Sequence, residues 1–312
     1  MKRIQYHTYG GPDVMRVEDF DLLPPGEAEV AVRVRFAAIN PIDWKLRSGQ
    51  MKIVTGNKFP RTMGMDFSGT VLSVGPGVKR LKVGDAVFGL ARFKESGAFA
   101  EAVITKEAFL TQKPDEVSFQ DAACLGTPGI TAWNGLIDKA KLHAGQHVFI
   151  NGCAGAVGEA AVQIAMMHGA VVSGSCSAKD IQRAQTLGVQ TVYDYRTTQL
   201  SSITARFDIV YDTAATLSIS TGVAMLRAGG VFLDLNPGPW KFVRAIFDRR
   251  LKPVIGSPRA DILDKLAKAA SAGSFRIPVG KTVALHDAIQ LIGDIENGRK
   301  PGGKAVIEMG DA

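Results

Sequence analysis

A strand, a tight turn and a helix follow one another at residues 148–167, and this succession constrains the fold more than any other feature of the chain. The apolar run at 148–150 stops at a turn of small residues, N-G-C-A-G-A, after which apolar residues recur at helical spacing from Val157 to Ala165. Small residues let a pyrophosphate approach the backbone, and the start of a helix offers it free N–H groups and partial positive charge. The segment therefore predicts a dinucleotide-binding turn.

The glycines of this turn match the dinucleotide pattern G-x-G-x-x-G only in part. Gly155 and Gly158 occupy the second and third positions, whereas Cys153 stands at the first and Gly152 precedes it. A second apolar run at 170–174 completes a β-α-β unit of about 30 residues. In this context we favour dinucleotide binding, with a tight turn of some other α/β fold as the alternative, and we interpret Cys153 as a buried small residue.

Length and composition are those of a soluble globular protein of two domains. The chain has 312 residues, of which 46% are hydrophobic and 21% charged. Its three cysteines, Cys124, Cys153 and Cys176, are far apart, so we expect no disulfide framework and a reducing compartment. The N-terminus leads into no long apolar run, and no apolar stretch reaches the roughly 18 residues of a membrane span. We therefore expect a cytoplasmic protein without signal peptide or membrane span.

The net charge is +7, which is compatible with an anionic ligand, a membrane surface or a nucleic acid. Basic residues are densest at 241–252, where they alternate with aromatic and aliphatic residues in the pattern of an amphipathic helix. We interpret this helix as a solvated face, with a wall over an anionic cofactor or a weak membrane contact as alternatives. Because no zinc-finger or RNA-binding signature accompanies it, we expect no nucleic-acid partner.

The pattern of elements changes near residue 122. Before it, short β-like runs such as 29–35, 69–74 and 85–89 are separated by Gly and Pro turns, so this half is expected to be all-β. After it, helical patterns at 130–139, 156–167 and 180–187 alternate with apolar runs at 148–150, 170–174, 191–193, 207–211 and 230–234. Such alternation predicts a doubly wound parallel sheet. The chain then returns to mixed character and ends in a strand at 304–308.

Several motifs carry a family resemblance across essentially the whole chain. They are N-P-I-D-W-K at 40–45, G-M-D-F-S-G at 64–69, V-G-D-A-V at 83–87, G-I-T-A at 129–132 and L-N-P-G-P at 235–239. In this order they resemble the medium-chain dehydrogenase/reductase superfamily. The chain looks most similar to its zinc-independent quinone oxidoreductase branch, within the group of the chloroplast-envelope quinone oxidoreductase homologue and the alkenal/oxoene reductases.

The resemblance implies an α/β protein with a GroES-like β-rich catalytic domain and a Rossmann domain with a doubly wound parallel sheet. The catalytic domain is expected to comprise residues 1–121 and 259–312, the NADP-binding domain residues 122–258, and the active site is expected in the cleft between them. Zinc-dependent relatives carry a cysteine near Pro41 and a His-Glu pair after a glycine, where this chain has Gly64-Met65-Asp66. Thiolate and imidazole are the groups that hold zinc. We therefore expect no metal.

The end of the second strand indicates which nicotinamide cofactor is used. NAD-binding sites place an acidic residue there, about 20 residues beyond the glycines. This chain has small hydroxyl residues and Lys179 instead, and Asp180 is expected to start a helix. A cation at this place suits a 2′-phosphate. In similar reductases the positions of Ser177, Lys179 and Tyr195 hold that phosphate, so we expect NADPH.

Other site residues are expected from the resemblance alone. Lys45 and Asn40 are the catalytic candidates, as donors to the substrate carbonyl oxygen, and Lys45 also reaches the cofactor. Further cofactor-binding positions lie near the nicotinamide, the pyrophosphate turn and the second strand. These are Thr131, Gly155, Ala156, Val157, Ser175, Asn236, Pro237 and Lys304. For Asp43 and Asp66, anchoring of loops is favoured over proton transfer.

These observations predict an NADPH-dependent, zinc-independent reductase that transfers hydride to a quinone or to the β-carbon of an α,β-unsaturated carbonyl. The cofactor carries this chemistry, and the protein orients the reactants. One alternative is a zinc-type alcohol dehydrogenase. Another is a non-catalytic NADPH-binding protein with a structural or RNA-binding role, as in the lens crystallins of the superfamily. We expect a small-molecule quinone, enone or enal as the partner, and a homodimer or a monomer.

Overall fold

The computed structural model describes residues 1–236 and 238–310. These residues form two compact units. The first unit combines Met1–Thr127 with the chain from Pro258 onward, and the second comprises Pro128–Ser257. The second unit is therefore inserted into the first along the chain.

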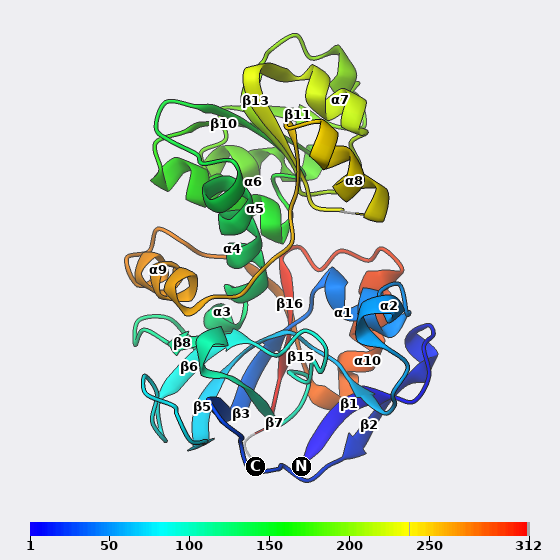
Figure 1. Cartoon of the computed structure of the whole chain (residues 1–312), viewed down its shortest axis with the longest axis vertical. Helices are drawn as coiled ribbons and strands as arrows, with labels where there is room; N and C mark the ends of the chain where they lie inside the picture. Colours follow the sequence, from blue (N-terminus) through cyan, green and yellow to red (C-terminus); the bar gives the residue numbers. More distant parts are fainter. Residues whose placement is uncertain (237, 311–312) are drawn as a thin grey trace. The chain divides into compact units, whose positions relative to one another are not determined.

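The second unit is built on a parallel sheet of six strands (Figure 1). Its strands are β9 (His147–Asn151), β10 (Val171–Cys176), β11 (Thr191–Asp194), β12 (Phe207–Asp212), β13 (Leu226–Asp234) and β14 (Leu251–Pro253). They lie in the order β11-β10-β9-β12-β13-β14, and each neighbouring pair is parallel. The order reverses at β9, which is the arrangement of doubly wound dinucleotide-binding sheets, with ligands at the carboxyl ends of the strands.

Helices cover both faces of this sheet. They are α4 (Gly126–Trp133), continued by a π-helical turn over Asn134–Lys139, α5 (Ala156–Met167), α6 (Ile181–Thr186), α7 (Ile219–Ala224) and α8 (Pro239–Phe247). Figure 1 shows α5 and α6 on one side of the strands and α7 and α8 on the other. The apolar strands are buried between the helices, with Phe149, Val210 and Phe232 in one core cluster. The predicted parallel sheet is confirmed, with element ends shifted by a few residues.

Two sheets make up most of the first unit. The larger follows the order β15-β16-β3-β5-β6-β8, with β7 paired to β3, and the smaller the order β2-β1-β4. The strands are β1 (Lys2–Tyr6), β2 (Met15–Asp19), β3 (Glu29–Ala38), β4 (Arg61–Thr62), β5 (Asp66–Val74), β6 (Ala86–Leu90), β7 (Ala102–Lys106), β8 (Leu110–Gln112), β15 (Val279–Ala284) and β16 (Lys304–Glu308). Strand β16 pairs with β3, which joins the end of the chain to its beginning.

The expectation of an all-β N-terminal half is wrong, because helices lie between its strands. They are α1 (Pro41–Arg47), α2 (Lys52–Thr55) and α3 (Phe119–Ala123), and the C-terminal segment adds α9 (Ala260–Ser271) and α10 (Ala288–Glu296). Helix α1 starts as helices commonly do, with Pro41 at its first position and the Asp43 carboxylate accepting the backbone N–H of Asn40 at 2.7 Å. The sequence carried this signal inside a β-rich stretch.

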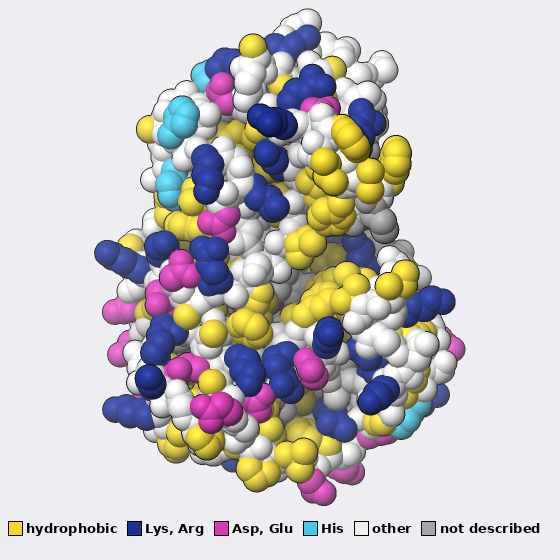
Figure 2. All heavy atoms as spheres, viewed as in Figure 1, with side chains coloured by type: hydrophobic (Ala, Val, Ile, Leu, Met, Phe, Trp, Pro, Cys, Tyr) yellow, Lys and Arg dark blue, Asp and Glu magenta, His cyan; other side chains and the backbone are white. Residues whose placement is uncertain are grey.

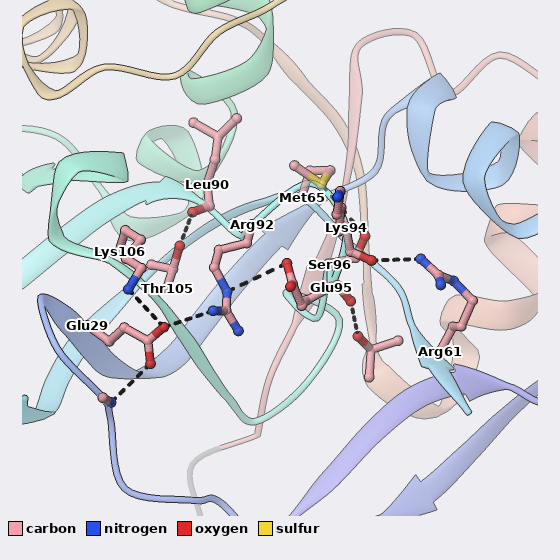
Figure 3. A network of polar contacts seen from close by, with 12 residues as sticks. Glu29, Arg61, Met65, Leu90, Arg92, Lys94, Glu95, Ser96, Thr105 and Lys106 are labelled. Atoms are coloured by element: carbon pink, nitrogen blue, oxygen red, sulfur yellow. Dashed lines mark hydrogen bonds and ion pairs between the residues drawn. The ribbon is translucent and has the colours of Figure 1, made fainter. Parts of the chain in front are cut away.

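Ion pairs fix the loop after β6 to the larger sheet. Figure 3 shows Arg92 and Lys106 directed at the carboxylate of Glu29, at 2.8 and 3.2 Å, while Arg92 also lies 3.6 Å from Glu95. The backbone N–H of Gly26 donates to the same Glu29 carboxylate, and this bond is the main reason why the pKa of Glu29 lies below its usual value. The cluster therefore holds β3, β7 and the loop together.

The amphipathic helix predicted at 241–252 is present as α8 only up to Phe247, and Leu251 already belongs to strand β14. The apolar side chains of α8 lie at the surface. Trp240, Ile246 and Phe247 are 72%, 75% and 85% exposed, and Figure 2 shows hydrophobic side chains gathered over this helix. Basic residues accompany them, and Lys241 pairs with the buried Asp234 of β13. None of the helices within residues 1–236 and 238–310 is long and apolar enough to cross a membrane.

Candidate active site

The turn after β9 needs its glycines for two different reasons. Gly152 has a φ of +81°, a conformation that side chains rarely adopt. Gly158 faces the same turn from helix α5, and a Cβ there would lie 2.0 Å from the carbonyl oxygen of Gly152. Glycine at 158 therefore lets the helix pack directly on the turn. Gly155 is the N-cap of α5 and is exposed.

The first turn of α5 fits a pyrophosphate. Ala156 and Val157 follow Gly155 as the first residues of this helix, and their side chains are only partly exposed. The first N–H groups of a helix have no partner within it, and they carry the positive end of the helix dipole. Backbone donors at a turn of small residues, at the carboxyl end of the central strand β9, are the expected cradle for a dinucleotide.

Cys153 replaces the first glycine of the pattern without disturbing the turn. Its side chain is completely buried, and burial raises the pKa of its thiol. A Cβ on Gly174 of β10 would lie 2.8 Å from the Cβ of Cys153 and 2.9 Å from its Sγ. Cysteine at 153 is thus accommodated by glycine at 174, and the interpretation of Cys153 as a buried packing residue is confirmed.

The three residues expected at a 2′-phosphate lie at the ends of neighbouring strands. Parallel register pairs Cys176 of β10 with Asp194 of β11, so Ser177 and Tyr195 are the next residues on the two strands. The backbone N–H of Tyr195 donates to the carbonyl of Cys176 at 3.2 Å. Lys179 is exposed, and the side chain of Tyr195 is 45% exposed. Ser177 is 3% exposed, so the ammonium group of Lys179 and the phenol of Tyr195 are the exposed donors that follow these two strands, and both groups suit a phosphate.

Asp180 follows this group and is not free in the structure. Its carboxylate accepts the hydroxyl of Ser177 at 2.5 Å and pairs with Arg183 of α6 at 3.3 Å. Arg183 was not among the residues singled out from the sequence. Arginine three residues beyond an acid on a helix is a common surface pair, so the sequence alone gave no reason to choose it.

Ser175 is placed inside the sheet. It is completely buried, and its hydroxyl donates to Oδ1 of Asn151 at 2.6 Å. Asn151 in turn donates to Asp212 at 2.6 Å and to Thr216 at 2.8 Å. Burial raises the pKa of Asp212. Ser175, Asn151 and Asp212 lie at or next to the ends of β10, β9 and β12. In the sequence they are visible only as polar residues at the ends of apolar runs.

The other expected positions of the second unit are scattered along its chain. Thr131 is 5% exposed on α4, and its carbonyl accepts the hydroxyl of the buried Tyr211 at 2.9 Å. Asn236 is exposed after β13, and its backbone N–H donates to Asp234 at 2.7 Å. Pro237 lies outside the described residues.

The first unit contains a buried polar cluster centred on Asn40. The Asn40 amide donates to Asp66 at 3.0 Å and to the carbonyl of Ala38 at 3.1 Å, while its oxygen accepts from Lys304. Lys304 also donates to the carbonyl of Ile39 at 2.7 Å, and Thr127 donates to Asp66 through its hydroxyl and its backbone. The cluster connects β16, β5 and the start of α1.

This cluster holds two carboxyl groups against one ammonium group. Asp43 and Asp66 are 2% and 0% exposed, and Lys304 is 6% exposed. Burial raises the pKa of Asp43 to about 8 and also raises that of Asp66, while Lys304 acts in the opposite direction on both. At neutral pH Asp43 therefore holds a proton for most of the time.

Lys45 differs from the other candidates, because its ammonium group has no hydrogen-bond or ion-pair partner among the described residues. It lies on α1, two residues beyond Asp43, and its side chain is partly buried. A half-buried cation without a partner is available to an oxygen that gains negative charge.

Within the described part of the chain, no three His, Cys, Asp or Glu side chains gather as a metal site would require.

Comparison with known proteins agrees with this geometry. The alcohol dehydrogenase GroES-like domain matches residues 26–115, and the zinc-binding dehydrogenase domain matches residues 187–307. The chloroplastic quinone-oxidoreductase homologue of Spinacia oleracea is 32% identical over 77% of this chain and 76% of that protein. The NADPH-dependent alkenal/one oxidoreductase of Arabidopsis thaliana is 31% identical over 78% of this chain and 65% of that protein. The structure of the Coxiella burnetii quinone oxidoreductase is 28% identical over 99% of both chains, with a TM-score of 0.89.

The GroES-like first unit and the dinucleotide-binding edge of the second define a nicotinamide-dependent oxidoreductase of the medium-chain superfamily. Within that superfamily, the chain belongs to the quinone oxidoreductase family. The expected fold class, a GroES-like domain together with a Rossmann domain, is confirmed.

Proposed function

We propose that the protein is an NADPH-dependent reductase of quinones or of α,β-unsaturated carbonyl compounds. The observation that carries this proposal is the end of β10, where Lys179 and Tyr195 offer exposed donors and the nearby acid, Asp180, is already paired with Ser177 and Arg183. The names of the relatives support the same chemistry, since one is called a quinone oxidoreductase homologue and another an NADPH-dependent alkenal/one oxidoreductase.

The residues of the second unit would hold NADPH in separate parts. The backbone of Gly155, Ala156 and Val157 would bind the pyrophosphate, and Lys179 and Tyr195 would donate to the 2′-phosphate, with Ser177 next to them. Thr131, Asn236 and Pro237 are assigned to the nicotinamide end. Ser175 contributes through its bond to Asn151, which fixes the strand end rather than touching the cofactor.

Bound NADPH supplies the hydride, so the chain has to orient the acceptor and stabilise the charge that develops on it. Lys45 is the donor that we assign to the acceptor's carbonyl oxygen, because its ammonium group is partly buried and uncommitted among the described residues. Asn40 has both amide hydrogens engaged. We therefore propose that it acts by holding the ammonium group of Lys304, and that Lys304 adds positive charge near the cofactor.

We propose that this reaction proceeds without zinc. The chain has Gly64-Met65-Asp66 where zinc-dependent relatives carry a ligand pair. We also propose that residues 122–258 bind the cofactor and that residues 1–121 and 259–312 provide the catalytic domain. The three cysteines are buried and unpaired, which suits a reducing cytoplasm. A homodimer and a monomer are both compatible with the proposal.

A panel of acceptors, each tested with NADPH and with NADH, tests the proposed function. We expect steady NADPH oxidation with 9,10-phenanthrenequinone or with a simple enone, and much slower oxidation of NADH. A preference for NADH would contradict the assignment of Ser177, Lys179 and Tyr195. Binding of NADPH without turnover of any acceptor would support a non-catalytic NADPH-binding protein instead.

A further inference from the structure

Arg183 connects the two parts of the dinucleotide-binding edge. It extends from α6, and its guanidinium group donates to the carbonyl of Ala154 in the turn after β9 at 2.8 Å. The same group lies 2.9 Å from the carboxylate of Glu159 on α5 and 3.3 Å from that of Asp180 after β10. The Arg183 side chain thus connects the turn after β9, helix α5 and the loop that follows β10.

The two carboxylates belong to the segments assigned to the phosphate groups of the cofactor. Glu159 is on the first turn of α5 and is 4% exposed, and burial raises its pKa to about 7 although Arg183 lowers it. Asp180 accepts the hydroxyl of Ser177. Without Arg183 the Asp180 carboxylate would repel a phosphate, whereas the buried Glu159 would hold a proton. Among the described residues, Arg183 pairs with both carboxylates.

Asp180 would by itself favour NADH over NADPH. An acidic residue beyond the second strand binds the ribose hydroxyls of NAD and repels a 2′-phosphate. Here the carboxylate is occupied, by Arg183 on one oxygen and by Ser177 on the other. The side chain that would favour NADH is present but already paired.

We propose that Arg183 is the residue that sets the preference for NADPH over NADH, by neutralising Asp180 and by fixing the strand-end loop against the turn through Glu159 and the carbonyl of Ala154. The inference rests on the proposed use of NADPH. Because Lys179 and Tyr195 would donate to the 2′-phosphate, Arg183 acts as a specificity-determining residue behind them.

The test measures the dissociation constants of NADPH and NADH separately, by fluorescence titration of the full-length protein without an acceptor. In R183Q we expect NADPH to bind about tenfold more weakly, because the Asp180 carboxylate is then no longer neutralised beside the 2′-phosphate. NADH should bind as well as before or better. In the double variant R183Q/D180N most of the NADPH affinity should return, because the freed carboxylate is absent. The matched control is R227Q, which breaks an ion pair of 3.1 Å with Asp208 in the same unit.

The outcomes separate the inference from the proposed function. Wild-type protein that binds neither cofactor, or prefers NADH, contradicts the proposed function. Wild-type protein that prefers NADPH, together with an R183Q variant that loses affinity for both cofactors equally, overturns the specificity role. If R183Q fails to fold, D180N alone decides: we expect unchanged or stronger NADPH binding, and weaker NADPH binding would overturn the inference.

Discussion

Asp43 combines two roles that its residue type alone would not indicate. Its carboxylate accepts the Asn40 N–H at the start of α1, and yet it is buried beside a second acid, Asp66. An aspartate at this position of a helix is usually exposed and charged. Burial overrides that expectation here, since it raises the pKa of Asp43 to about 8. The consequence is a proton held inside the folded protein.

This proton makes stability depend on pH. The unfolded chain releases it near the ordinary aspartate pKa of about 3.9. The folded protein keeps it up to about pH 8. Between these values the free energy of unfolding falls as pH rises, by at most about 1.4 kcal/mol per pH unit for this group. In D43N we expect a shallower decline between pH 5 and 8, measured by urea unfolding at each pH.

The control for D43N is D19N, since Asp19 has a side chain that is 78% exposed. D19N should follow the wild-type dependence. Asp66, whose pKa is also raised by burial, continues to contribute in both variants, so some decline remains. A D43N curve parallel to the wild-type curve would show that Asp43 is charged in the folded protein.

Lys45 is the residue on which the proposed chemistry depends most directly. Removing a donor to an oxygen that gains charge typically lowers kcat by about 10²–10³. We expect K45M to show a loss of this order in kcat with the best acceptor, with an unchanged melting temperature, since Lys45 has no partner to lose among the described residues. K52M, on the exposed start of α2, is the matched control and should keep full activity. Full activity in K45M would remove Lys45 from the mechanism.

At the scale of elements, two glycines near the turn between β9 and α5 have different roles. A methyl group at 158 would lie 2.0 Å from the Gly152 carbonyl oxygen, whereas one at 155 would meet the same atom at 3.4 Å. G158A should therefore destabilise the protein, by about 1–3 kcal/mol as for other overpacked sites. G155A should unfold as the wild type does but bind NADPH more weakly, because Gly155 is exposed where the pyrophosphate is expected.

Thermal unfolding and NADPH titration on both glycine variants check this prediction. Equal destabilisation by the two substitutions would contradict the assignment of packing to Gly158 alone. Unchanged NADPH binding in G155A would indicate that the pyrophosphate does not approach this residue.

Most strands and helices of the second unit were predictable, because each buried strand is a short apolar run and the helices repeat apolar residues at helical spacing. Helix α7 was not predicted, and β14 begins within a segment predicted as helix. Helix α1 was missed, although Pro41 and Asp43 are typical of a helix start, because its seven residues interrupt a β-rich stretch. The packing of Cys153 against Gly174 could not be read from either segment. This contact depends on the pairing of β9 with β10, which a local sequence pattern does not reveal.

At the scale of the whole molecule, the sequence could not predict the contacts that the candidate site residues make in the structure. Ser175 turns into the sheet toward Asn151, and Asn40 is fully engaged with Asp66 and Lys304. Lys304 follows Asn40 by 264 residues, so this contact requires the last strand of the chain, β16, to pair with β3. Contacts of this kind come from the topology, and a motif in one segment cannot specify them.

The whole-molecule prediction concerns metal. Zinc-type dehydrogenases need thiolate or imidazole ligands, and catalytic zinc polarises the substrate oxygen. We propose Lys45 as the donor to that oxygen instead, and conjugated acceptors spread the charge that arrives with the hydride. Dialysis against a strong chelator should therefore leave both NADPH-dependent turnover and the melting temperature unchanged. Elemental analysis of the undialysed protein should find far less than one zinc per chain. The prediction would be wrong if the protein held one tightly bound zinc whose removal abolished activity and whose addition restored it. The protein would then be a zinc-dependent dehydrogenase.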